Sequence, residues 1–328
     1  MSLVIPSLPT FADPLLLDLW QRAPDLYALL DPARTADSPL GTPVDFEPSG
    51  DGGRGDSYRL AQRDPRIRAC GIAELFRLAS SDGHLSSWRP EDVVLDVLGG
   101  DGTLARAIVD LLPRRARPTV FTSDLSAGMV RAAQRHDLPA VRQAAQALRL
   151  RDDAVDAVVL AYGTHHIPVA ERAAAVSEAC RVLRPGGRLV LHDFDECSPA
   201  AQWFGEVVDA YSRTGHRYAH FTCGEMRRLL AGAGLVDVVV QPLYDPFVLT
   251  GTSRAAVRRA LGEHLRQMYG LVRVDAERVA ELATVCFRYT DEQSAPGQRV
   301  RKVSYTRVAG RWRVELPRVA LVARGRRI

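Results

Sequence analysis

The sequence of 328 residues has no long uninterrupted apolar run, few cysteines and a single lysine. No stretch reaches the roughly 20 consecutive apolar residues of a membrane-spanning helix, which argues against an integral membrane protein. Pro6, Pro9 and Pro14 interrupt the apolar N-terminus, and the first basic residue is Arg22, so the pattern of a secretory signal is missing. We therefore expect a cytoplasmic protein with no membrane partner.

The five cysteines are widely spaced, and none belongs to a Cys-x-x-Cys pair. Their odd number and their spacing argue against a disulfide framework and against a zinc site built from cysteines. We expect free thiols in a reducing compartment.

Charge is divided unevenly along the chain. The net charge is +4, but residues 253–328 carry 17 basic and 7 acidic side chains, so the rest of the chain is acidic overall. Lys302 is the only lysine, and every other basic side chain is arginine. A basic region of this kind is either a solvated surface or a face for an anionic substrate or a nucleic acid, and both interpretations remain open.

The N-terminal third lacks the pattern of a sheet. Residues 14–31 and 58–82 have apolar side chains at helical spacing, whereas residues 41–57 are rich in glycine, proline, aspartate and serine and are expected to form a loop. We interpret residues 1–88 as a helical N-terminal cap without chemistry of its own.

From residue 91 onward, apolar runs of strand length alternate with amphipathic helical stretches. This alternation predicts an α/β fold, in which helices cover both faces of a mostly parallel sheet. Ligands bind to such sheets beyond the carboxyl ends of the strands. The expected strands are residues 93–98, 119–123, 140–142, 155–162, 188–192, 236–241 and 319–323. A helix is expected over residues 200–212, and short alternating segments, broken by Pro296–Gly297 and Gly310, over residues 283–313.

A glycine-rich turn, Leu98-Gly99-Gly100-Asp101-Gly102, joins the first strand to a helix. Glycines let the backbone approach a ligand, and the start of the helix offers free N–H groups. Asp124 ends the second strand, where a carboxylate can accept two ribose hydroxyls. These features predict a cofactor that carries a nucleoside.

Four segments identify the family that the chain resembles. They are VVLDVLGGDGTLARAI (92–107), SDLSAGMVRAA (123–133), DDAVDAVVLAYGTHHIP (152–168) and CRVLRPGGRLVLHDF (180–194). Their order and spacing resemble the class I S-adenosylmethionine-dependent methyltransferases, in particular the small-molecule branch with the ubiquinone- and sterol-type enzymes. The resemblance covers about residues 90–240.

The resemblance implies a Rossmann-like, doubly wound sheet of seven strands whose last strand is antiparallel. It divides the chain into the N-terminal cap (1–88), a cofactor-binding core (89–241), a lid insertion between strands 6 and 7 (242–315) and a final core strand (316–328). We expect the lid and the N-terminal helices to roof the substrate pocket.

The resemblance also implies the cofactor, S-adenosylmethionine, and the residues that hold it. It places the turn glycines beside the methionine part, Asp124 on the ribose, and residues 143–146 at the edge of the adenine. The expected cofactor-binding residues are Gly99, Gly100, Gly102, Asp124, Leu125, Met129, Ala145, Gln146 and Tyr162.

Two positions depart from the family pattern. Leu98 stands where the family usually has glycine, and Ala144 stands where it usually has an aspartate that bonds to the adenine amine. The amide oxygen of Gln146 can replace that bond. These departures motivate an alternative, a methyltransferase-fold cyclase or pericyclic catalyst that transfers no methyl group.

Methyl transfer to a hydroxyl or an acidic carbon needs a base near the carboxyl end of the fourth or fifth strand. His165 and His166 follow the fourth strand and are the candidate catalytic residues, because histidine is readily tuned near pH 7. The alternative is a structural turn in which one of them bonds to the backbone. No metal site is predicted, since His192 and Asp193 have no evident third ligand.

Five residues are candidates for the substrate site: His192, His216, Tyr218, His220 and Arg258. Arg258 shares a helix face with Arg254 and Arg259, and this face could meet an anionic group.

We predict methyl transfer to an oxygen or carbon of a small, possibly anionic molecule of specialised metabolism, with histidine-assisted deprotonation. A homodimer remains open. The basic C-terminal third motivates an RNA methyltransferase as a weaker alternative, although no RNA-binding module is evident. A protein that binds without catalysis is the last alternative.

Overall fold

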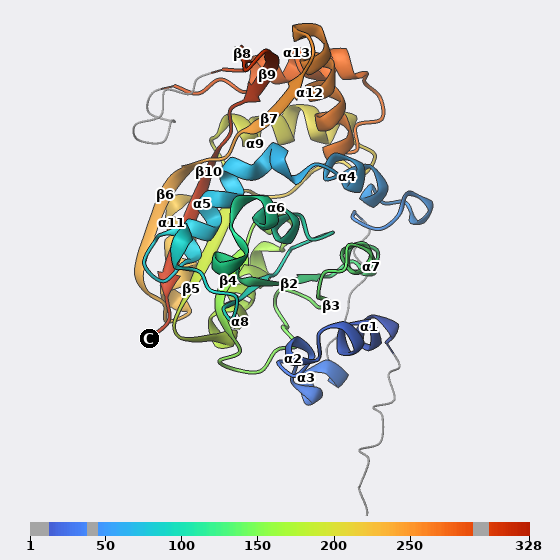
Figure 1. The fold of residues 1–328 in the computed structure, drawn as a ribbon. Helices are drawn as coiled ribbons and strands as arrows, with labels where there is room; N and C mark the ends of the chain where they lie inside the picture. Colours follow the sequence, from blue (N-terminus) through green and yellow to red (C-terminus); the bar gives the residue numbers. More distant parts are fainter. Residues whose placement is uncertain (1–12, 38–44, 291–301) are drawn as a thin grey trace, which may run out of the picture.

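The computed structural model describes residues 13–37, 45–290 and 302–328. Their main element is a seven-stranded sheet in the order β3-β2-β1-β4-β5-β10-β6 (Figure 1). The strands are β1 (Val93–Asp96), β2 (Thr119–Asp124), β3 (Ala140–Arg142), β4 (Val155–Leu160), β5 (Leu183–Asp193), β6 (Val236–Tyr244) and β10 (Val319–Arg326).

The directions of the strands match the expected fold. Strands β1 to β5 pair in parallel, and β10 inserts between β5 and β6, antiparallel to both. The predicted doubly wound sheet with an antiparallel last strand is therefore confirmed.

Helices cover both faces of the sheet because neighbouring strand residues point in opposite directions. Val94 packs into the core that contains Ile72 and Ile108, whereas Leu95 packs into the core that contains Val176 and Met226. The first core includes α5 and α6, and the second includes α8 and α11. The helices around the sheet are α4 (Gly55–Ala61), α5 (Ala69–Ala79), α6 (Thr103–Leu111), α7 (Ala127–Arg135), α8 (Arg172–Val182) and α11 (Cys223–Gly232).

The two ends of the molecule carry additions to the sheet. Figure 1 shows α1 (Pro14–Arg22), α2 (Pro24–Tyr27) and α3 (Pro32–Asp37) at the end opposite to α12 (Arg254–Met268) and α13 (Ala276–Cys286). A second sheet, in the order β7-β9-β8, accompanies α12 and α13. Its strands are β7 (Phe247–Gly251), β8 (Ser304–Val308) and β9 (Arg311–Leu316).

This second sheet lies in the residues between β6 and β10. The sequence analysis expected short alternating segments over 283–313, and it missed α13. The signal was present, because the side chain of Asp275 caps α13 and accepts from the Arg278 N–H. The Pro296–Gly297 break expected in the same stretch lies outside the described residues. The role of residues 242–315 as a lid stays a prediction.

Two further elements differ from expectation. The loop predicted over residues 41–57 extends too far, because α4 begins at Gly55. The single helix expected over 200–212 consists of α9 (Pro199–Trp203), a π-helical turn (Phe204–Val208) and α10 (Asp209–Tyr211). Such wide turns are frequent at functional sites, and this one carries Phe204 toward the site described below. In the described part of the chain, none of the helices has the length and apolar character needed to cross a bilayer.

The packing of α12 on α13 gives a first test. A Cβ atom at Gly262 of α12 would lie 1.8 Å from the carbonyl oxygen of Ala276. We expect Gly262→Ala to lower the free energy of unfolding by about 1–3 kcal/mol, because the backbones must separate.

The matched control is Gly232→Ala at the end of α11, where no described atom lies within 4 Å of the added Cβ. There alanine should be neutral or stabilise by about 0.4–1 kcal/mol. Denaturant unfolding of both variants checks the pair, and equal effects would contradict the close approach.

Candidate functional site

The glycine turn after β1 and the end of β2 form one unit. Gly100 and Gly102 adopt positive φ angles of 56° and 82°, which favour glycine. The Gly100 N–H donates to Asp124 Oδ2 at 3.0 Å, and the Ser126 N–H donates to Asp124 Oδ1 at 2.8 Å. Burial raises the pKa of Asp124 to about 6. The turn thus holds one carboxylate at the carboxyl edge of the sheet.

A cavity of about 370 Å³ lies beside this unit, which is within the size range of small-molecule sites. Most of the expected cofactor residues line it. They are Gly100, Asp124, Leu125, Met129, Ala145, Gln146 and Tyr162, joined by Leu98, His166 and Tyr218.

Two expected glycines shape the turn but are not on the cavity wall. A Cβ at Gly99 would lie 2.7 Å from Asp96 Oδ2 and from Thr122 Cγ2, and a Cβ at Gly102 would lie 2.2 Å from Leu138. These positions need glycine because neighbouring side chains pack against them.

Only part of the segment 143–146, which was expected to border the adenine, lies on the cavity wall. Gln143 and Ala144 are buried and do not line the cavity. Gln146 lies on the wall, and its amide donates to Glu171 Oε2 at 2.6 Å. Glu171 was missed, since it comes from the turn Val169–Glu171 and no sequence spacing links it to the third strand.

The N-terminal region, expected to be a cap without chemistry of its own, contributes side chains to the cavity wall. Asp45, Phe46 and Tyr58 line the cavity, and the Phe46 and Tyr58 rings meet edge to face at 5.3 Å. Arg54 fixes this segment: its guanidinium binds both oxygens of Asp45, and it donates to the Met268 carbonyl at 2.8 Å. One wall of the cavity is therefore held against α12.

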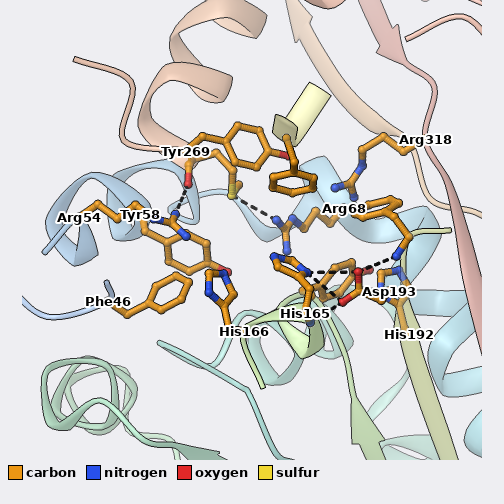
Figure 2. A pocket seen from close by; sticks show the side chains of 14 residues that line it. Phe46, Arg54, Tyr58, Arg68, His165, His166, His192, Asp193, Tyr269 and Arg318 are labelled. Atoms are coloured by element: carbon orange, nitrogen blue, oxygen red, sulfur yellow. Dashed lines mark hydrogen bonds and ion pairs between the residues drawn. The ribbon is translucent and has the colours of Figure 1, made fainter. Parts of the chain in front are cut away.

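A second, smaller cavity of about 30 Å³ lies behind the first. Phe46, Tyr58, Tyr162 and His166 border both cavities. Figure 2 shows that the smaller one is surrounded by charged and aromatic side chains from distant parts of the chain. Its other lining residues are Arg54, Arg68, His165, His192, Asp193, Phe194, Phe204, Met268, Tyr269 and Arg318.

The three arginines of the smaller cavity have different partners. Arg54 pairs with Asp45, and Arg318 forms a buried ion pair with Asp245. Arg68 has no carboxylate within ion-pair distance in the described part of the chain, although it is only 5% exposed. The buried Arg68 Nε has no hydrogen-bond partner there, and Nη2 contacts only the Met268 sulfur at 3.2 Å.

The Tyr162 ring forms the platform beneath Arg68. The Arg68 guanidinium lies 4.5 Å from the centre of this ring, and the Tyr162 hydroxyl donates to Asp245 Oδ1 at 3.2 Å. Tyr162 adopts a left-handed φ of 61°, a strained conformation that is typical of functional sites. Burial opposes the charge of Arg68, but the nearby Tyr58, Tyr162 and Asp245 outweigh it and raise the pKa of Arg68 above its usual value. The guanidinium therefore stays charged, and because Asp245 is paired with Arg318, it remains suited to bind an anion.

Asp193, at the end of β5, organises the histidines. Its Oδ2 accepts from the Thr164 hydroxyl at 2.5 Å and from the His165 N–H at 2.8 Å. His165 Nδ1 lies 2.9 Å from Asp193 Oδ2, and His220 Nδ1 lies 3.1 Å from Asp193 Oδ1. These neighbours hold the pKa of Asp193 well below its usual value.

His166 and His216 complete the cluster around His165. The ring centres of His166 and His216 lie 4.5 Å and 5.0 Å from that of His165, and the Tyr218 ring lies 4.3 Å from the His166 ring. Burial lowers the pKa of His166 well below its usual value and that of His216 to about 2. The structure therefore brings together every expected histidine of this region.

His192 and Arg258 occupy different places. His192 lies at the floor of the smaller cavity, fully buried, with Nε2 3.6 Å from Asp245 Oδ2. Arg258 lines neither of the two cavities. Its side chain forms ion pairs with Glu277 and Glu281 of α13.

Comparison with known proteins identifies the core. Residues 94–187 match the family model described as "Methyltransferase domain". The "Ubiquinone/menaquinone biosynthesis C-methyltransferase UbiE" of Brucella canis is 37% identical over 136 residues, which cover 40% of this chain and 50% of that protein. The protein of the same name from Bartonella tribocorum is 34% identical over 134 residues, 39% of this chain and 48% of that protein.

Residues 94–187 form a methyltransferase domain. This match bears out the resemblance to the S-adenosylmethionine-dependent methyltransferases over this part of the chain. The chain spans about half the length of the curated relatives that it matches. A similar fold occurs in a solved complex from Haloferax volcanii, which joins the Trm112 methyltransferase activator to a protein described as a methyltransferase. The matching chain has a TM-score of 0.50 and 17% identity, and the match covers 87% of this chain and 99% of that chain.

Asp96 lies beneath the glycine turn of the methyltransferase domain and was not singled out from the sequence. Its residue exposure is 1%, and neither carboxylate oxygen has a partner among the described residues. Burial, and secondarily the charge of Asp124, raise the pKa of Asp96 to about 8 from a usual value of 3.8.

This raised pKa predicts a pH-dependent stability for the cofactor-free protein. Between pH 4 and pH 8 the folded state keeps a proton on Asp96 that the unfolded state releases, so stability falls as the pH rises. Asp96→Asn removes this linkage. We compare the free energy of unfolding of the variant with that of the wild type at each pH. The difference in favour of the variant should be about 2–5 kcal/mol larger at pH 9 than at pH 5. Urea unfolding at the two pH values measures it, and a gain independent of pH would contradict the burial of an ionisable Asp96.

Proposed function

We propose that this protein transfers the methyl group of S-adenosylmethionine to an oxygen or carbon of a small anionic molecule. One observation carries the proposal: the cavity beside Gly100 and Asp124 borders, through Tyr162 and His166, a second cavity with an unpaired arginine. We propose that the larger cavity holds the cofactor and that the acceptor lies at the shared wall. The smaller cavity, at about 30 Å³, has room for the acceptor's anionic group and not for the whole molecule.

The cofactor is held by groups of different chemistry. Asp124 accepts hydrogen bonds from the ribose hydroxyls, and Leu125 and Met129 cover the adenine with apolar surface. Gln146 and Glu171 supply acceptors for the adenine amine in place of the family's aspartate. Leu98 is half-buried on the wall and leaves the cavity open, which supports cofactor binding despite this departure.

The shared wall suits a sulfonium that loses its charge. Phe46, Tyr58 and Tyr162 present aromatic rings there, and aromatic faces attract cations. An enclosed site also excludes water, which favours a reaction that disperses positive charge. These rings hold the methyl donor and direct it toward the smaller cavity.

The histidines of the wall assist the loss of the acceptor's proton. His165 and His166 face the smaller cavity, and Asp193 fixes the orientation of the His165 ring through Nδ1. A ring oriented in this way presents its other nitrogen to a substrate. The oxygen or carbon freed of its proton then attacks the methyl carbon as the carbon–sulfur bond breaks.

Arg68 binds the acceptor's anionic group. It takes over the role that the sequence analysis gave to Arg258, because it is the buried guanidinium of the cavity that lacks a carboxylate partner among the described residues. Phe194, Phe204 and Tyr269 add aromatic surface, so we propose an aromatic or otherwise planar carboxylate as acceptor.

The relatives are named for ubiquinone/menaquinone biosynthesis, and we propose a different acceptor for this chain. The family match covers residues 94–187, whereas Arg54, Arg68, Tyr269 and Arg318 lie outside it. We therefore propose an acceptor from specialised metabolism, with residues 242–315 as a lid. A cytoplasmic location and a homodimer stay predictions from the sequence.

The cofactor site has a direct test. Calorimetric titration with S-adenosylmethionine should show binding to the wild type and an affinity about 10- to 100-fold lower for Asp124→Ala, because hydrogen bonds to a charged group are lost. The exposed Asp110 on α6 provides the control Asp110→Ala, which should bind as the wild type does. No binding to the wild type would refute the proposed function. Conversion of an acceptor with unchanged mass would favour the cyclase alternative.

The acceptor site is tested with Arg68→Met. In the presence of S-adenosylhomocysteine, aromatic carboxylates should raise the melting temperature of the wild type more than the matching carboxamides do. Arg68→Met should lose this preference, because the group that binds the anion is removed, and its melting temperature without ligand verifies that the variant folds. The control is Arg63→Met, at an exposed arginine nearby. Equal effects of carboxylates and amides on the wild type would contradict an anion site.

A further inference from the structure

We propose that His165, His166 and His216 bind a divalent transition-metal ion, with Zn²⁺ as the best match. No metal was expected from the sequence, because His192 and Asp193 had no evident third ligand. The fold brings together a different set, in which His216 from the loop between α10 and α11 joins His165 and His166. The inference deepens the proposed function, since the ion would lie next to the acceptor.

The three imidazoles converge from two separate parts of the chain. His165 and His166 belong to the turn Thr164–His166 after β4, and His216 comes from the loop that follows α10. Their candidate ligand nitrogens lie within 4.8 Å of one another. A tetrahedral zinc ion with bonds of 2.0–2.1 Å needs nitrogens about 3.4 Å apart, so small ring rotations would close the site.

His216 points most directly to a missing partner. It is 6% exposed, and neither of its ring nitrogens has a hydrogen-bond partner in the parts of the chain that the structure describes. Its position is nevertheless fixed: the Phe204 ring stacks on it at 4.3 Å, and its backbone N–H donates to Asp209 Oδ1 at 2.7 Å. A buried polar ring without a partner is costly, and an ion would satisfy it.

Asp193 has the position of a carboxylate behind a metal-bound histidine. Its Oδ2 lies 2.9 Å from His165 Nδ1, which leaves His165 Nε2 for the ion. A dashed line in Figure 2 marks this contact. Carboxylates that hold the second nitrogen of a ligating histidine are the rule at zinc sites. His220 makes the same contact with Asp193, and its buried Nε2 has no partner among the described residues.

A second set, His165, Asp193 and His220, also has its ligand atoms within 4.8 Å. We favour the three histidines, because the oxygens of Asp193 already accept from Thr164, from the Phe194 N–H and from the two imidazoles. The carboxylate is therefore occupied as an orienting group.

The surrounding charges are compatible with a cation. Arg54 lies near the histidines but is paired with Asp45, whose Oδ2 is 3.8 Å from His166 Nδ1. Asp193 provides a further negative charge, and Arg68 lies across the smaller cavity. An anionic acceptor placed between the ion and Arg68 would contact positive charge on both sides.

The ion would give His165, His166 and His216 a defined chemical role. With three protein ligands, a fourth position stays open, as in catalytic zinc sites. The ion would lower the pKa of an acceptor hydroxyl bound there, and the proton would leave with solvent as the acceptor enters. The oxygen lone pair would then form the bond to the methyl carbon while the carbon–sulfur bond breaks, and the electrons of that bond would stay on sulfur as neutral S-adenosylhomocysteine. With the ion bound, His165 and His166 would assist the loss of the proton as ligands and not as bases.

The experiment measures metal binding by the full chain after removal of metals with a chelator. Titration with Co²⁺, followed by its visible absorption, and with Zn²⁺, followed by calorimetry, should give one site per chain with tetrahedral Co²⁺ bands. His216→Ala and His166→Ala should weaken binding at least 100-fold, and Asp193→Asn about 10- to 100-fold. His136→Ala, at an exposed histidine after α7, should bind as the wild type does.

Two further measurements keep the result decisive. His216→Cys keeps a ligand at this position, so it should retain binding and add a sulfur-to-cobalt charge-transfer band. Circular dichroism and S-adenosylmethionine titration on every variant verify the fold. A wild type that binds S-adenosylmethionine but no Co²⁺ or Zn²⁺ would overturn the metal site and leave the proposed function standing. Binding that survives both His216→Ala and His166→Ala would assign the ion elsewhere and also overturn it.

Discussion

The site depends on the carboxylate of Asp193 at the end of β5. Its two oxygens connect the turn after β4, through Thr164 and His165, with the loop that carries His220. The carboxylate itself is 1% exposed, so its charge is balanced by hydrogen bonds rather than by water. Without it, neither the turn nor the loop would have a fixed relation to the sheet, and the histidines would not converge.

Local sequence signals predicted the framework of this fold correctly. The apolar runs set the strands of the main sheet, and the glycines set the turn beneath the cofactor cavity. The position of Asp124 followed from its place at the end of a strand. These features depend on the backbone and on short-range spacing, which a single sequence contains.

The acceptor site was less visible in the sequence, for a physical reason. Arg54 and Arg68 come from the N-terminal region and Arg318 from the last part of the chain, and only the folded chain shows which guanidinium has a carboxylate partner. The chain contains many arginines, so residue type alone gave no distinction, and the helix-face spacing of Arg258 was misleading. His216 was named as a candidate, but its approach to His165 depends on tertiary contacts with Phe204 and Asp209.

The place of β10 in the sheet has a consequence for how the protein folds. This strand, residues 319–326, lies between β5 and β6, although both are made earlier on the ribosome. Until it emerges, the facing edges of β5 and β6 lack their native pairing, and exposed strand edges are prone to non-native association. Arg318 directly precedes β10, so the polypeptide completes its acceptor cavity in the same late event that closes the sheet.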